Sequence, residues 1–179
     1  MSNALRLANV VHVLAAKRNV DHLKLQKLTF YAYGAALAHD VSAELGEVHF
    51  APWKHGPVNR EVWDAHRGSA SAILPLPASA SRFSNALTQV LADVVEVYGR
   101  LGSWEIRCES HLETPWIEAW EQQQARISEA SIAKHFREKF KPGHVQLPAN
   151  LGAVAVGRID GIPSPRFASL ASMASALRG

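Results

Sequence analysis

The fold is decided by residues 23–34, which read Leu-Lys-Leu-Gln-Lys-Leu-Thr-Phe-Tyr-Ala-Tyr-Gly. Apolar side chains recur in this stretch and just beyond it at intervals of three and four residues, which places them on one face of a helix. The residues of that face are Leu23, Leu28, Tyr31, Ala32, Ala35 and Ala36. The stretch therefore predicts a helix that packs on a core. Lys24 and Lys27 lie off the apolar face, where we expect them to be solvated or to meet a partner.

A second informative stretch lies at residues 53–58 and reads Trp-Lys-His-Gly-Pro-Val. Glycine followed by proline is typical of a turn, and an aromatic ring beside two basic side chains can recognise a partner. Gly56 permits a close approach of the backbone, and Pro57 stiffens the exit. The stretch predicts a displayed binding loop. The alternative is that Trp53 belongs to the core and that His55 bonds a neighbouring backbone group.

The remaining pattern up to residue 144 is mainly helical. Helices are expected over residues 5–18, 21–39, 57–68, 83–98, 103–110, 114–120 and 128–140. Their predicted N-terminal residues are Asp21, Pro57, Ser103, Thr114 and Ser128. Val48, Phe50 and Trp53 are interrupted by polar positions and bounded by Gly46 and Pro52, which predicts a short strand or hairpin arm within residues 41–53. The fold class is therefore mainly α, a compact helical domain with a small β element and an irregular C-terminal tail.

Residues 145–179 are expected to form a C-terminal arm or tail after a domain of residues 1–144. Proline and glycine punctuate this segment, as in a wrapping arm. Its last part can start a helix at Ser164-Pro165. Phe167, Leu170, Met173 and Leu177 would then share one side, so the segment predicts a short amphipathic helix that docks on its own domain or on a second partner.

Composition describes an ordinary globular chain of 179 residues, 47% hydrophobic and 20% charged. No apolar run is long enough for a membrane span or a secretion signal, and one cysteine excludes an intramolecular disulfide and a cysteine-based zinc site. We expect a cytoplasmic protein. A net charge of +3 is mildly basic, but the charge is dispersed, which argues against nucleic-acid binding. A DNA-binding regulator would need Arg126, Lys134, Arg137 and Lys141 on one face.

Catalytic chemistry finds little support in the sequence. None of the nine histidines has the spacing of a zinc site. Cys108 and His111 could form a thiol–imidazole pair, but a lone cysteine among apolar residues is more often a small buried side chain. Glu105, Glu109 and Glu113 recur every four residues, which indicates a solvated helix face. We expect no enzyme activity, no metal and no cofactor.

Three segments together resemble the Panacea domain, the family of SocA-like antitoxins and of proteins often labelled phage-associated. The first two are the stretches quoted above. The third runs from Tyr98-Gly99-Arg100-Leu101-Gly102-Ser103-Trp104-Glu105 through Ser110-His111-Leu112-Glu113-Thr114-Pro115-Trp116. The resemblance spans roughly residues 5–140.

The resemblance implies an antitoxin that binds a nearby-encoded protein toxin directly, without cofactor or reaction, and in the SocA-like branch delivers it to the ClpXP protease through the ClpX unfoldase. The candidate partner-binding residues are Lys24, Lys27, Trp53, Lys54, His55, Gly56, Pro57, His111 and Trp116. Trp116 and Trp120, spaced by four residues, are also candidates for the core. A DNA-binding regulator, a scaffold and a cysteine hydrolase are the alternatives.

Overall fold

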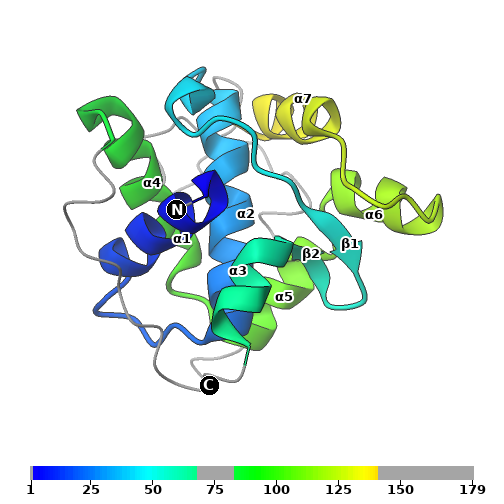
Figure 1. Cartoon of the computed structure of the whole chain (residues 1–179), viewed down its shortest axis with the longest axis horizontal. Helices are drawn as coiled ribbons and strands as arrows, with labels where there is room; N and C mark the ends of the chain where they lie inside the picture. The colour runs from blue at the N-terminus through cyan, green and yellow to red at the C-terminus, as the bar shows by residue number, and fades with distance from the viewer. Residues whose placement is uncertain (1, 68–82, 141–179) are drawn as a thin grey trace, which may run out of the picture.

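The computed structural model describes residues 2–67 and 83–140, and its architecture is mainly helical, as predicted (Figure 1). The predicted tail helix lies outside these residues. The elements, in chain order, are α1 (Asn3–Leu14), α2 (His22–Ala38), a 3-10 turn η1 (Ser42–Glu44), β1 (Ala51–Trp53), β2 (Gly56–Val58), α3 (Arg60–His66), α4 (Asn85–Tyr98), α5 (Ser103–Ser110), α6 (Thr114–Glu121) and α7 (Glu129–Lys139).

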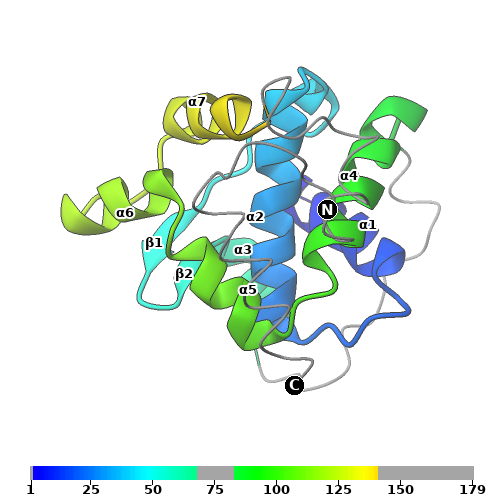
Figure 2. The ribbon, with the colours of Figure 1, turned by 180° about the vertical axis from the view of Figure 1, so that it is seen from behind.

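Helix α2 runs through the middle of the molecule, with the other helices arranged around it in both views (Figures 1 and 2). It contacts α1, α3, α4, α5, α7 and β2, and every one of its residues from 24 to 37 is buried. A helix that is covered on all sides has no solvated stripe. The expectation that Lys24 and Lys27 form a solvated face is therefore wrong: they are 4% and 0% exposed.

Several predicted helix starts are confirmed by side-chain caps. The carboxylate of Asp21 accepts a hydrogen bond from the backbone N–H of Lys24 at 2.8 Å, and Ser128 accepts one from Ser131. Such caps satisfy backbone donors that the first helical turn leaves without partners. Asp21 and Ser128 thus begin their helices as the sequence predicts.

Three other starts differ by one or more residues. Gly102, not Ser103, is the N-cap of α5, because Glu105 reaches back to the N–H of Gly102 at 2.6 Å. Glu113, not Thr114, precedes α6. Pro57 does not open a helix at all: it lies in β2, and α3 begins after Asn59, whose side chain accepts from the N–H of Val62.

Strands β1 and β2 form an antiparallel hairpin whose turn is Lys54-His55. In a two-residue hairpin the closing pair, here Trp53 and Gly56, exchanges hydrogen bonds, and the next pair does not. That next pair is Pro52 and Pro57. Because this position of the ladder requires no backbone N–H donor, two prolines fit there. Pairing of the two prolines explains how a Pro-rich segment can form a strand pair.

Candidate partner-binding surface

The polar side chains of α2 attach the hairpin to the core. Gln26 bonds the backbone of Asn59 twice: its Nε2 donates to the Asn59 carbonyl at 3.2 Å, and its Oε1 accepts from the Asn59 N–H at 2.9 Å. The Nζ of Lys27 donates to the Pro57 carbonyl at 2.9 Å. The two sequence stretches that carry the resemblance are therefore bonded to each other, and the buried face of α2 sets the position of the hairpin.

Lys27 is buried and forms no ion pair with a carboxylate of residues 2–67 and 83–140. Burial, followed by the charge of Arg107, lowers its pKa to about 7. Burial also lowers the pKa of Lys24. A charged ammonium loses its hydration inside a protein, so the neutral amine is favoured. Lys27 therefore positions the Pro57 backbone, and neither lysine lies on the surface.

Gly56 brings the hairpin backbone close to the core. Its φ of +92° is a conformation that glycine adopts without strain. A Cβ built there would lie 2.5 Å from the Ser110 Oγ and 3.0 Å from the Lys27 Nζ. Gly56 and Pro57 are buried, so the predicted displayed loop reduces to the two turn residues, Lys54 and His55, which are exposed.

Helix α5 adds two residues to this surface that the sequence analysis missed. Arg107 donates from its Nε to the Nδ1 of His55 at 3.2 Å, and its guanidinium lies 4.4 Å from the ring centroid of Trp104. Trp104 is 63% exposed. Their spacing of three residues on a helix was a signal that they share a face.

A row of stacked rings continues the surface onto α6. His111 stacks on Trp116 at 4.2 Å between centroids, and Trp116 stacks on Trp120 at 5.6 Å. The indole N–H of Trp116 donates to the Trp53 carbonyl at 3.1 Å, which ties α6 to β1. Burial, followed by the charges of Arg107 and Lys27, lowers the pKa of His111 to about 4, so the ring is neutral at pH 7.

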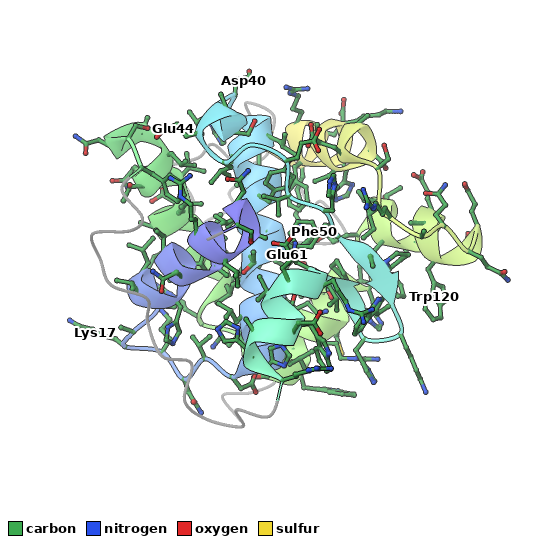
Figure 3. All side chains as sticks on the ribbon, viewed as in Figure 1. Lys17, Asp40, Glu44, Phe50, Glu61 and Trp120 are labelled. Atoms are coloured by element: carbon green, nitrogen blue, oxygen red, sulfur yellow. The ribbon has the colours of Figure 1, made fainter. Side chains whose placement is uncertain are left out.

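The two tryptophans of α6 have different environments. Trp116 is 8% exposed and belongs to the core, as one of the two predictions had it. Trp120 is 45% exposed, so the expectation that it is a core residue is wrong; it lies on the outer side of α6 (Figure 3). We call the exposed and half-buried set the hairpin surface: Lys54, His55, Trp104, Arg107, His111 and Trp120.

Behind the hairpin surface lies a buried ionic cluster centred on Glu113. Its carboxylate accepts from Lys139 Nζ at 2.6 Å, from Tyr31 at 3.0 Å and from His135. Burial alone would raise the pKa of Glu113, but Lys139 and His135 hold it at about 2, and Glu113 in turn raises the pKa of Lys139 against its burial. The prediction of a solvated glutamate face is wrong, since Glu109 and Glu113 are 3% and 1% exposed.

The arrangement of residues 2–67 and 83–140 gives little support to a cysteine hydrolase, a DNA-binding regulator or a metal site. Cys108 is half-buried rather than fully buried. Arg137 pairs with Asp40 at 2.7 Å, Arg126 lines a separate groove of about 760 Å³, and Lys141 lies outside the described residues, as do Phe167, Leu170, Met173 and Leu177. Within the described ranges no group of three His, Cys, Asp or Glu side chains could hold a metal, and no helix is long and apolar enough to cross a membrane.

Comparison with known proteins identifies the family. Residues 25–117, just over half of the chain, match the family described as antitoxin SocA-like, Panacea domain. Searches of curated proteins and of solved structures found no match. The match begins inside α2 and ends inside α6, so it contains most of α2, the hairpin and α5, and with them every residue of the hairpin surface except Trp120. The chain belongs to the Panacea-domain family of SocA-like antitoxins.

Proposed function

We propose that this protein neutralises a protein toxin by binding it directly at the hairpin surface, and that it then delivers the bound toxin to the ClpXP protease. Membership of the antitoxin family supports a protein partner. The observation that carries the choice of surface is the anchoring of the hairpin: Gln26 and Lys27 fix its backbone, and Trp53 receives the indole N–H of Trp116. A preformed surface loses little conformational entropy on binding.

In this proposal the site residues have two roles. Lys54, His55 and His111 contact the toxin, because they lie on or beside the exposed turn. The buried residues Lys24, Lys27, Gly56, Pro57 and Trp116 hold that turn in place and would affect binding indirectly. Delivery to ClpX requires a second surface, and the segment with Phe167, Leu170, Met173 and Leu177 is proposed for it. No catalytic step is involved, and a cytoplasmic location follows from the partner protease.

The test is co-expression of the full chain with the protein encoded beside its gene. We expect the antitoxin to restore growth, to co-purify with the toxin, and to shorten the half-life of the toxin only while ClpX is present. Restored growth with an unchanged toxin half-life would support neutralisation by binding and contradict delivery of the toxin to ClpXP. Failure of the neighbouring protein to co-purify, with growth unrestored, would contradict the proposal as a whole.

A further inference from the structure

Arg107 carries a charge that the described part of the chain does not neutralise. Its guanidinium makes a hydrogen bond to His55 and stacks on Trp104, and no carboxylate of residues 2–67 and 83–140 forms an ion pair with it. Five other arginines of the described residues have carboxylate partners, namely Arg18, Arg60, Arg67, Arg100 and Arg137, whereas Arg6 and Arg126 form no such ion pair there. Arg107 is thus the arginine of the hairpin surface, and its charge has no carboxylate partner within residues 2–67 and 83–140.

The guanidinium is also held in one orientation. Its Cζ lies over the Trp104 ring, 4.4 Å from the ring centroid, and its Nε donates a hydrogen bond to His55. An arginine side chain has five N–H donors, and those on the two terminal nitrogens of Arg107 have no hydrogen-bond acceptor within residues 2–67 and 83–140. A stacked arginine loses less side-chain entropy when it binds a carboxylate bidentately.

The surroundings of Arg107 are positive. Lys54 lies beside it in the exposed turn of the hairpin, and the charge of Arg107 itself contributes to the lowered pKa of His111. The hairpin itself contains no acidic residue. The acidic residues of α5 are used elsewhere, because Glu105 caps Gly102 and Glu109 is 3% exposed.

We propose that Trp104 and Arg107, with Lys54 and His55, form a binding site for an acidic segment of the protein partner. A partner carboxylate is held by the terminal nitrogens of Arg107, and an adjoining apolar side chain packs on Trp104. This inference rests on the proposed function for the identity of the partner, and on charge complementarity for its chemistry.

The acidic segment comes from another molecule. Residues 68–82 contain no Asp or Glu, and residues 141–179 contain only Asp160, so the parts of the chain outside the description supply no acidic run. A nucleic-acid backbone would need a longer row of cations, whereas Lys54 and Arg107 are the permanently charged groups of this site. The geometry thus favours a short carboxylate-bearing peptide.

Peptide titration of the ¹⁵N-labelled full chain tests the site itself. The probe is an end-capped (Glu-Ala)₃ peptide, and the end-capped (Gln-Ala)₃ peptide is the neutral control. We expect saturable shifts of the Trp104 indole N–H and the Arg107 Nε–H with the glutamate peptide, at least fivefold weaker affinity in Arg107→Gln, and unchanged affinity in Arg60→Gln.

Arg60 is the matched control because it also lies over a tryptophan, Trp53, at 5.8 Å, but is already paired with Asp64 at 3.3 Å. Equal shifts with both peptides, or undiminished affinity in Arg107→Gln, would overturn the proposal. Tighter binding of a hexathymidylate than of the glutamate peptide would also overturn it, in favour of nucleic acid.

A second experiment uses the co-purified toxin. Arg107→Glu is expected to weaken retention of the toxin at least tenfold, while Arg60→Glu changes it less than twofold. If Arg107→Glu lowers the melting temperature, Trp104→Ala replaces it, since Trp104 is the most exposed of the large apolar side chains described. Equal retention by wild type and Arg107→Glu leaves the proposed function intact and refutes the acidic-segment site. No retention by wild type refutes the proposed function, and the peptide titration still decides the site.

Discussion

Lys27 illustrates how a single buried residue can link two parts of the chain at a cost in stability. It is 0% exposed, its Nζ bonds the Pro57 carbonyl, and its pKa falls to about 7 mainly because it is desolvated. Between that value and about 10.5 the unfolded chain holds a proton that the folded protein does not. Stability therefore rises with pH through this window, because the unfolded state binds more protons there.

Lys27→Met is expected to remove that rise. Below pH 7 the variant should be at least as stable as wild type, since methionine has a similar volume and no charge to bury. At pH 10 it should be less stable by about 1 kcal/mol, because the Pro57 carbonyl has lost its donor. Urea denaturation at pH 6, 8 and 10 measures the crossing. Parallel pH profiles of the two proteins would show that Lys27 is not desolvated as described.

Gly34 sets the distance between α2 and α7. A Cβ at this position would overlap the ring of Phe136, which is 0% exposed. Gly34→Ala should therefore destabilise the protein by about 1–3 kcal/mol through overpacking, despite the better helix propensity of alanine. The double variant Gly34→Ala/Phe136→Leu should lose less unfolding free energy than the two single variants lose together. A double-mutant cycle measured by urea denaturation tests this. Strict additivity would place the strain elsewhere.

At the scale of elements, the Glu113 cluster joins two consecutive helices, α6 and α7. Glu113 stands at the start of α6, while Lys139 and His135 lie near the end of α7. The attraction between buried charges compensates their desolvation only while both partners are present. The cluster therefore makes the docking of α7 depend on an ion pair as well as on apolar contact.

Removing both members of this pair should cost less than the sum of the two single removals. We expect Glu113→Gln and Lys139→Met each to lower the free energy of unfolding by about 3–5 kcal/mol, because each leaves an uncompensated buried charge. The double variant should lose less than the sum by about 1–3 kcal/mol. Thermal and urea denaturation of all four proteins provide the cycle. A double variant as unstable as the sum would contradict the proposed coupling.

For the whole molecule, buried titratable groups predict sensitivity to acid. Burial lowers the pKa of His12, His22, His39 and His111, the last to about 4. As the pH falls below 6.5, these histidines become protonated in the unfolded chain but stay neutral in the folded protein. The free energy of unfolding therefore decreases with falling pH. Glu113, with a pKa of about 2, adds a further loss below about pH 4.5.

The melting temperature of the full chain should therefore fall steadily from pH 7 to pH 4. His111→Gln is the variant of choice, since glutamine cannot take up a proton on unfolding. Its melting temperature should decline less between pH 6.5 and 4 than that of wild type. An unchanged slope would mean that His111 titrates normally in the folded state.

Helix periodicity and capping residues predicted most of the elements in the described ranges. The stripe of α4 and the caps at Asp21 and Ser128 were correct because they depend on local chemistry. The environments of Lys27 and Glu113 were predicted wrongly for one shared reason. Charged residues are usually solvated, and only the later parts of the chain supply the carbonyl or the countercharge that makes their burial possible.

The sequence by itself determined a mainly helical domain of the Panacea family, since periodicity, caps and three motif segments are local properties of the chain. Only the tertiary structure decided which polar residues are buried and hold the hairpin in place, and which are exposed on the hairpin surface. Gln26 and Lys27 turn inward because Asn59 and Pro57 cross α2, and Arg107 and Trp104 join His55 because α5 packs beside the hairpin. Such contacts join residues about 30 to 50 positions apart, and no local pattern encodes them.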